Sequence, residues 1–371
     1  MWPLNKWRTR VAIILGVMVV IALIIIIFAP GEEPKKKELE IGRTGVNWTR
    51  YQPEETTGHH ESFFQRANHP SRPLAFWIRY TIFSPKEHPE NALGELWAIY
   101  FDGETGNHVA VKKEVPLRQC TFKTSEFFVS ISDSSLEPGR LRGSAASGSH
   151  TISWDLGFGG GETPLFLLPL KSYGKRLPKA KALVGLPMAM YNGSISVDGE
   201  DINIVNWIGS QNHNWGSKHT DYYAWGQVAG FESHPDSFLE VISARFKVGP
   251  FWTPVMTLLV LRHKGEEIAL NGLIQSIRAT ASINYFNWDF KSETDRIRIE
   301  GMVSARREDF VGLKYYNPPG GIKYCLNTKI ASCELRITHK QSNRVDSLST
   351  RHRAAFEILT DDQQHGVTIR N

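Results

Sequence analysis

The 371-residue sequence has few cysteines and lacks the common catalytic signature motifs. Cys120, Cys325 and Cys333 are widely spaced and form no C-x-x-C pair, so neither a disulfide scaffold nor a structural zinc site is indicated. No G-x-S-x-G or H-E-x-x-H motif occurs, and the glycine-rich stretch 157–161 is not followed by the Gly-Lys-Ser of a phosphate-binding loop. These absences argue against an α/β-hydrolase, and we expect no metal and no cofactor.

A strong excess of positive charge is also missing. The formal net charge is +5, and Lys6, Arg8 and Arg10, ahead of a long apolar run, account for three of the excess charges. The rest of the chain carries no basic stripe of the kind that binds nucleic acid, so we predict no nucleic-acid partner.

The apolar run covers 11–28, eighteen residues without a charged side chain, and ends at Pro30 and Gly31. As a helix it would be about 27 Å long, close to the hydrocarbon thickness of a bilayer. Because this run is longer than the apolar region of a typical signal peptide, we predict an uncleaved transmembrane anchor over 1–31, with a cleaved signal peptide as the alternative. A charged linker follows over 32–45.

Positive charges on the two flanks of this run nearly balance, since Lys35, Lys36, Lys37 and Arg43 follow it. A short basic tail is more easily left in the cytoplasm than moved across the membrane. We therefore expect a single-pass membrane protein whose globular part lies outside the cytoplasm.

Beyond residue 45 the helical period of 3.6 is rare, whereas period-two runs bounded by turn residues recur. Strands are predicted over 74–83 and 94–102, and a hairpin joins 188–197 to 201–207 across Asp198-Gly199. Further strands are predicted over 223–231, 238–246, 253–262, 267–273, 283–290, 296–303 and 331–337. These are too many for one small barrel, so we predict an all-β protein with two antiparallel domains, 46–208 and 209–371.

Nine tryptophans follow the anchor. A single buried tryptophan is usually a core residue, but as a group they suit the lining of an apolar cavity. The expected partner is a hydrophobic small molecule.

The most informative segment is Gln211-Asn212-His213-Asn214-Trp215-Gly216, followed by the strand that carries Tyr223, Trp225 and Gln227. The last three residues share one face of that strand. We expect the segment to lie just before the strand, near the mouth of a cavity, where polar side chains beside aromatic rings would suit a mostly apolar ligand with one polar end.

Over about residues 60–360 the chain resembles the lipocalin-like family of carotenoid 1,2-hydratases (hydroxyneurosporene synthases), which is related to tocopherol cyclases and fungal Diels-Alderases. The resemblance is carried by His213-Asn214-Trp215-Gly216 before Trp225-Gly226-Gln227, by Asn68-His69-Pro70 before Trp77, by Asp198-Gly199, and by Asn317-Pro318-Pro319-Gly320 before Cys325. It implies two tandem calycin barrels and a cofactor-free hydratase or cyclase that acts on an isoprenoid or lipid.

One position departs from the family pattern. The family has an aspartate where this chain has Asn212, and an amide cannot donate a catalytic proton. Asp221, Glu232, Glu162 or Asp155 could replace it, as could His213 or His219 as weaker acids. The candidate catalytic residues are Asn212, His213 and Asp221, and the candidate ligand-binding residues are Trp215, Tyr223, Trp225, Gln227, Trp77 and Arg79.

Structural roles compete with these assignments. His213 could cap a turn, Asp221 could be a solvated turn residue, and Arg79 is expected to pair with a carboxylate. Asn212 favours two further classes of protein, a non-catalytic lipid carrier or envelope lipid-handling protein and a pericyclic enzyme that transfers no proton. A purely structural envelope protein is the remaining alternative. The sequence does not fix the oligomeric state.

Overall fold

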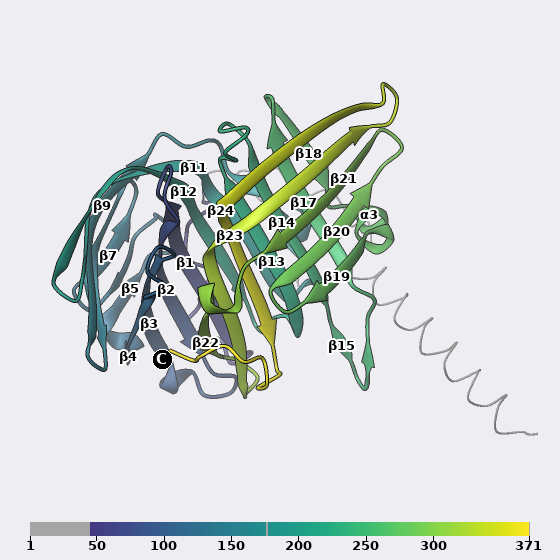
Figure 1. The fold of residues 1–371 in the computed structure, drawn as a ribbon. Helices are drawn as coiled ribbons and strands as arrows, with labels where there is room; N and C mark the ends of the chain where they lie inside the picture. Colours follow the sequence, from purple (N-terminus) through teal and green to yellow (C-terminus); the bar gives the residue numbers. More distant parts are fainter. Residues whose placement is uncertain (1–44, 176, 371) are drawn as a thin grey trace, which may run out of the picture.

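The computed structural model describes residues 45–175 and 177–370. The predicted anchor and nearly all of the linker lie outside these residues. In the described part of the chain, none of the helices has the length and apolar character needed to cross a bilayer. The predicted all-β class is confirmed, because two curled, near-barrel antiparallel sheets make up almost all of the regular structure (Figure 1).

The first sheet has the strand order β4-β3-β2-β1-β12-β11-β9-β8-β7-β6-β5, with β10 paired to β11. Its strands are β1 (His59–Asn68), β2 (Leu74–Ser84), β3 (Leu93–Asp102), β4 (Val109–Pro116), β5 (Cys120–Phe122), β6 (Val129–Ile131), β7 (Ser134–Glu137), β8 (Arg140–Ser147), β9 (His150–Gly159), β10 (Leu165–Phe166), β11 (Ala180–Val197) and β12 (Glu200–Gly216).

The second sheet has the order β18-β17-β14-β13-β24-β23-β21-β20-β19, with β22 paired to β23. Its strands are β13 (Tyr222–Ala229), β14 (Phe238–Arg245), β17 (Met256–His263), β18 (Glu266–Leu270), β19 (Thr280–Asn284), β20 (Asn287–Glu293), β21 (Ile297–Ser304), β22 (Val311–Tyr316), β23 (Ile322–His339) and β24 (Arg344–Thr360). The strands β15 (Lys247–Val248) and β16 (Phe251–Trp252) pair separately, and the helix α3 spans Leu273–Arg278. Short 3-10 turns occupy Pro89–Asn91, Leu117–Gln119, Leu170–Ser172 and Arg307–Asp309.

The predicted hairpin across Asp198-Gly199 is confirmed as the β11–β12 hairpin. Both turn residues have positive φ, 52° and 89°, as a tight two-residue hairpin turn requires. The strand predicted over 283–290 is wrong, because Tyr285 and Phe286 form a turn between β19 and β20. Phe286 has a φ of 72°, and the two aromatic residues at the centre of the turn are flanked by Asn284 and Asn287.

The chain changes sheets between Gly216 and Tyr222, a few residues after the predicted boundary at 208/209. β12 continues past that boundary because residues up to Gly216 still pair with both β1 and β11. In each sheet the last two strands in chain order form a long hairpin with strands of 18 and 17 residues, β11–β12 in the first and β23–β24 in the second. These matching hairpins give the two halves a common plan that the sequence does not show as a repeat.

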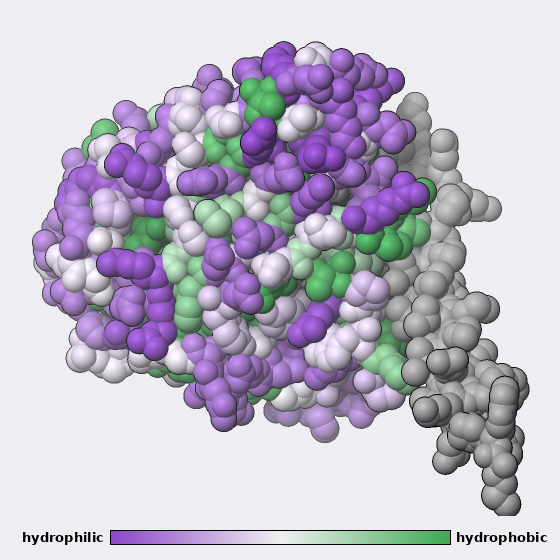
Figure 2. Space-filling model, turned by 45° about the vertical axis from the view of Figure 1, so that its right-hand side comes forward, coloured by the Kyte–Doolittle hydropathy of each residue, from purple (hydrophilic) through white to green (hydrophobic). Residues whose placement is uncertain are grey.

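Alternation along the strands creates three apolar layers. In β1, Phe63 packs into the core of the first sheet, whereas the next residue, Phe64, faces the second sheet. Trp154 and Trp207 lie in the first core, and Trp288 lies in the second. A third cluster lies between the sheets and includes Phe64, Trp77, Trp97, Trp225 and Tyr315. The inner layers hold most of the large apolar side chains, and the face seen in Figure 2 is mainly hydrophilic with separate hydrophobic patches.

Candidate functional site

A cavity of about 160 Å³ lies between the two sheets. The first sheet and the loop after it contribute residues from β1, β2, β11 and β12, and the second contributes residues from β13, β14, β17, β22 and β24. Most of the wall is aliphatic or aromatic, and most of the polar side chains in it are buried. Its chemically relevant wall residues are His60, Phe64, Trp77, Arg79, Lys181, Asn212, Asn214, His219, Tyr223, Trp225, Glu240, Tyr315 and Glu357. This is the composition of a site for a hydrophobic molecule with localised polar groups.

Glu240 of β14 is a buried carboxyl group in the cavity wall, 3% exposed. Its Oε1 accepts a hydrogen bond from Trp225 Nε1 at 2.8 Å, and its Oε2 accepts one from Gln227 Nε2 at 2.7 Å. Burial raises the pKa of Glu240 to about 7, although these two hydrogen bonds and the nearby Arg66 favour the charged form. A carboxyl group with this pKa exchanges protons near neutral pH, which is the property of a general acid.

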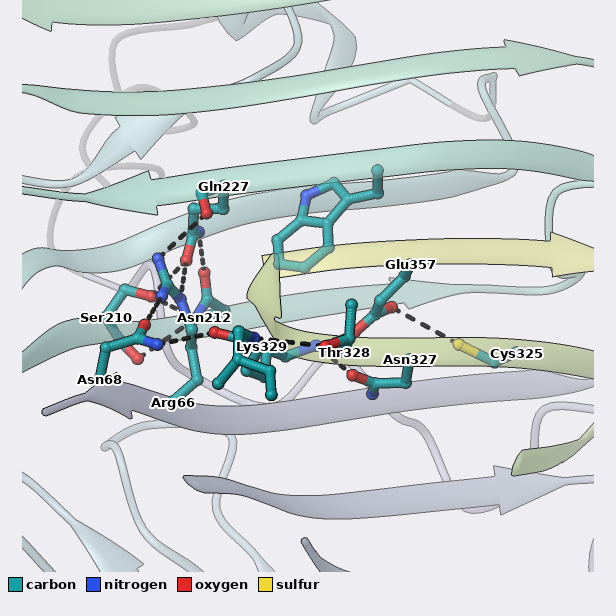
Figure 3. A network of polar contacts seen from close by, with 12 residues as sticks. Arg66, Asn68, Ser210, Asn212, Gln227, Cys325, Asn327, Thr328, Lys329 and Glu357 are labelled. Carbon is teal, nitrogen blue, oxygen red and sulfur yellow. Dashed lines mark hydrogen bonds and ion pairs between the residues drawn. The ribbon is translucent and has the colours of Figure 1, made fainter. Parts of the chain in front are cut away.

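Behind Glu240, a chain of buried polar side chains joins the two sheets (Figure 3). Gln227 Nε2 also donates to Asn212 Oδ1 at 2.8 Å, and Gln227 Oε1 accepts from Ser210 Oγ at 2.6 Å and from Arg66 Nε at 2.7 Å. Asn212 Nδ2 donates to Ser210 Oγ at 2.9 Å. Asn212 therefore uses both ends of its amide within the protein, and its role in the structure is to hold Gln227.

A second buried carboxylate, Glu357 of β24, also lines the cavity. Its Oε1 lies 2.7 Å from Lys329 Nζ, and its Oε2 lies 3.7 Å from Cys325 Sγ (Figure 3). Burial lowers the pKa of Lys329, although the negative charge of Glu357 acts to raise it. Among the described residues, Glu357 has a cation within ion-pair distance and Glu240 has none, so the charged form is favoured more strongly at Glu357.

His213 lies on the opposite face of β12 from Asn212. Its Nε2 is 2.7 Å from Glu61 Oε1, and its Nδ1 is 2.6 Å from the carbonyl oxygen of Val46. Burial would raise the pKa of Glu61, but hydrogen bonds from His213 and His59 outweigh it and lower the pKa to about 2. Part of His213 reaches the cavity wall, yet both ring nitrogens are held by protein groups.

Arg79 of β2 points into the cavity wall from the first sheet. Its Nη2 donates to Ser62 Oγ at 2.6 Å, and its guanidinium lies 4.4 Å from the ring centre of Tyr315. Among the described residues no carboxylate lies within ion-pair distance of Arg79, so the expected pairing with a carboxylate is wrong. Glu95 and Glu357 are the acidic residues whose charges act on Arg79, but each forms its ion pair with a lysine, Lys112 and Lys329 respectively.

The structure separates the predicted site residues into groups. Trp77, Arg79, Asn212, Tyr223 and Trp225 line the cavity, and Gln227 lies directly behind its wall. The segment around Asn212 precedes β13 in the chain, as expected, and it is itself part of β12, where it pairs on both sides.

Two predicted residues lie away from the cavity wall. Trp215 is on the His213 face of β12, with its ring 4.7 Å from His213 and the guanidinium of Arg50 5.3 Å from its ring centre. Asp221 is buried between the sheets, where it accepts from Lys218 Nζ at 2.6 Å and from the backbone N–H of Lys247 at 3.0 Å. Asp221 therefore fixes the connection between the sheets, and it is not the solvated turn residue of the competing reading.

None of the other carboxylates considered from the sequence lines the cavity. Glu232 pairs with Arg351, Glu162 with Arg262 and Asp155 with Arg140. Sequence reasoning missed Glu240, although one signal was present: it is the single acidic residue of the predicted strand 238–246, on the same face as Phe238 and Ile242.

The described residues contain no group of three or more histidine, cysteine or acidic side chains arranged to hold a metal ion.

No protein-family model matches the sequence. An uncharacterized protein of Mycobacterium tuberculosis, in strains H37Rv and CDC 1551, is 22% identical over 202 residues, which are 54% of this chain and 59% of that protein. The match thus spans little more than half of the curated relatives' length.

The two-sheet fold is shared with solved proteins. CghA, solved with Sch210972, superimposes with a TM-score of 0.51 at 10% identity, over 85% of this chain and 95% of CghA. Kievitone hydratase from Nectria haematococca gives a TM-score of 0.48 at 11% identity, over 81% of this chain and 89% of that protein. At such identities the likeness to CghA shows the two-sheet fold alone.

Proposed function

We propose that this protein binds an isoprenoid or other hydrophobic small molecule between its two sheets, and that Glu240 donates a proton to a carbon–carbon double bond of that molecule. The reaction class is hydration or cyclisation without a cofactor, similar to that of carotenoid 1,2-hydratases. The observation that carries the proposal is a buried carboxyl group with a pKa of about 7 in the wall of an aromatic-lined cavity.

The proposed step starts with Glu240 protonated. The π electrons of the double bond take the proton, the O–H bond breaks, and a carbocation and a Glu240 carboxylate remain. Trp225 Nε1 and Gln227 Nε2 stabilise that carboxylate through the hydrogen bonds they already make. The faces of Trp225, Tyr223 and Trp77, all in the cavity wall, stabilise the cation.

The fate of the cation distinguishes the two reactions. In hydration a water molecule adds to the cation, an alcohol forms, and the proton lost from the added water returns to Glu240. In cyclisation a second double bond of the same molecule attacks the cation, and loss of a proton from a neighbouring carbon to Glu240 restores neutrality. Both routes regenerate the protonated acid.

We also propose that the apolar stretch 11–28 anchors the protein in a membrane, with the globular part outside the cytoplasm. The proposal is supported by the length of that stretch and by the basic residues before it. A reporter that is active only in the cytoplasm, fused to the carboxyl end, should be inactive, and an active fusion would contradict this orientation.

The function is tested with the full-length protein in detergent. Apolar molecules that co-purify are identified by mass spectrometry, and the protein is then incubated with the recovered molecule in D2O. The proposal predicts a product with a new carbon–deuterium bond, formed by wild-type protein and not by the Glu240→Gln variant. The matched control is Glu232→Gln, whose acid pairs with Arg351 outside the cavity.

Two results would contradict the enzymatic proposal. If the recovered molecule stays unchanged with wild-type protein, the protein is a carrier. An apolar cavity without a proton donor is sufficient for that function. If Glu240→Gln forms the deuterated product as fast as wild type, another group donates the proton.

A further inference from the structure

We propose that the Arg79 end of the cavity binds an anionic head group, such as a carboxylate, of the hydrophobic ligand. The inference rests on the cavity of the proposed function but not on proton donation by Glu240. It specifies the substrate class as an amphipathic acid, whereas the apolar wall alone would accept a neutral hydrocarbon or alcohol equally well.

Arg79 is a buried cation without an anionic partner among the residues that the structure describes. Its side chain is 5% exposed, and its single protein hydrogen bond there goes to the neutral Ser62 Oγ. Nε is buried and makes no hydrogen bond. Burying a guanidinium with most of its N–H groups unpaired is costly, and an anion in the cavity would remove that cost.

Further unpaired donors surround the guanidinium. Trp77 Nε1 is buried without a hydrogen-bond partner, and the ring centre of Trp77 lies 5.8 Å from the Arg79 guanidinium carbon. His60, also in the cavity wall, has two buried ring nitrogens that bond no side chain of the described residues, and its ring stacks on that of His219 with 3.9 Å between the ring centres. A carboxylate accepts several hydrogen bonds at once, and arginine offers a planar pair of donors that matches its geometry.

The surrounding charges favour an anion over a cation at this end. Burial, together with the neighbouring His219, His59 and Arg79, lowers the pKa of His60, so it is a neutral donor at pH 7. Glu95 and Glu357 are paired with lysines, as described above. Arg79 is therefore a cation of this part of the wall that has no carboxylate within ion-pair distance among the described residues, although Glu95 and Glu357 act on it from farther away.

The head-group site and the proton donor are close together. Arg79 bonds Ser62, which donates to Asn214 Oδ1, whereas Glu240 is linked through Gln227 to Asn212. Asn212 and Asn214 are two residues apart on one face of β12, about 7 Å along the strand. The reacting double bond is thus expected a few bonds from the anionic group.

The test uses two probes with the same isoprenoid chain, geranic acid and geraniol, and measures their binding to full-length protein at pH 7 by calorimetry. We expect wild-type protein to bind the acid about tenfold or more tightly than the alcohol. The Arg79→Gln variant should lose this preference, and Arg140→Gln, an exposed arginine paired with Asp155, should keep it.

Circular dichroism shows whether Arg79→Gln is folded. A second variant tests the inference if it is not. Ser62→Ala removes the hydrogen bond that positions the guanidinium, together with the one that Ser62 Oγ donates to Asn214 Oδ1, and should reduce the preference several-fold. Lys181→Gln changes another cation of the cavity wall, whose Nζ bonds the carbonyl oxygen of Pro178 at 2.9 Å. Loss of the preference in Lys181→Gln, with retention in Arg79→Gln, would place the anion elsewhere and overturn the inference.

Equal affinity of wild-type protein for the acid and the alcohol, or failure to bind either, would also overturn the inference. Equal affinity would leave the proposed function standing. The Glu240→Gln variant tests proton donation independently of anion binding. It should lose turnover and still bind the acid more tightly than the alcohol.

Discussion

The indole N–H of Trp225 donates to Oε1 of Glu240 at 2.8 Å, and both side chains lie in the wall of the cavity between the sheets. This hydrogen bond stabilises the charged form of an acid whose pKa burial has raised to about 7. The pair thus balances two opposing effects, and changing either member has consequences that can be measured.

Activity should depend on pH through Glu240. Because the acid must be protonated to donate, turnover should be high below about pH 7 and fall as the pH rises through that value. Glu240→Gln should lower turnover about 100-fold or more at pH 6, where the wild-type acid is protonated, and by less as the pH rises above 7. A turnover rate that increases between pH 6 and pH 8 would contradict the assignment of Glu240 as the acid.

The Trp225→Phe variant removes the indole donor and keeps an aromatic ring in the wall. Loss of a hydrogen bond to the charged form disfavours that form, so the pKa of Glu240 should rise and the fall in activity should move upward by about one pH unit. Measurement of the pH profile tests this. An unchanged profile with merely lower activity would mean that Trp225 only shapes the cavity.

Stability should also report on Glu240. Its folded-state pKa lies above its ordinary value of 4.5, so its contribution is fully present below about pH 4.5 and is lost as the pH rises through about 7. Relative to Glu240→Gln, wild-type protein should lose roughly 3 kcal/mol of unfolding free energy across that range. Urea unfolding of both proteins at pH 4.5 and pH 8 measures the difference, and parallel stability curves would refute it.

Glu61 should behave in the opposite way. Its pKa is lowered to about 2 in the folded protein, so it stabilises the fold above about pH 4.5, and this contribution is lost as the pH falls toward 2. Glu61→Gln should destabilise the protein by about 3 kcal/mol or more at pH 7, since it breaks a buried pair with His213. If its unfolding midpoint at pH 7 equals that of wild-type protein, the pair does not hold the fold.

Asn212→Asp restores the acid of the family that the sequence resembles. The structure predicts no gain of activity, because Asn212 Nδ2 donates to Ser210 Oγ and a carboxylate in its place would lose that bond and lie near Glu240. We expect the variant to be about 1–3 kcal/mol less stable. Activity that appears only in Asn212→Asp would mean that Glu240 is not the donor in the natural protein.

The β class and most of the strands could be predicted from the sequence. Successive side chains of a strand point to opposite faces of the sheet, so a strand appears in the sequence as a run with a period of two residues. The turn at Tyr285 and Phe286 was missed because its two central residues are aromatic, although Asn284 and Asn287 flank it. The cavity-facing side of β13 was predicted from the spacing of Tyr223, Trp225 and Gln227. What the spacing could not show is that the cavity lies between two sheets and not inside one barrel.

The site itself was predicted in part. Trp77, Arg79, Tyr223 and Trp225 were selected by residue type and line the cavity. Glu240 is distant from the central motif in sequence and reaches it only through pairing of β13 with β14, where Gln227 stands opposite it. Nonlocal register of this kind decides which carboxyl group is buried beside the aromatic rings, and a single sequence does not specify it.

The most direct measurement is the protonation state of Glu240 itself. Infrared difference spectra of wild-type protein minus Glu240→Gln, recorded across the pH range, isolate the carbonyl stretch of its protonated carboxyl group. The account predicts that this band is present at pH 6 and disappears with a midpoint near pH 7. A band that is already lost at about pH 5, near the ordinary pKa of glutamate, would contradict a protonated acid in the cavity at neutral pH.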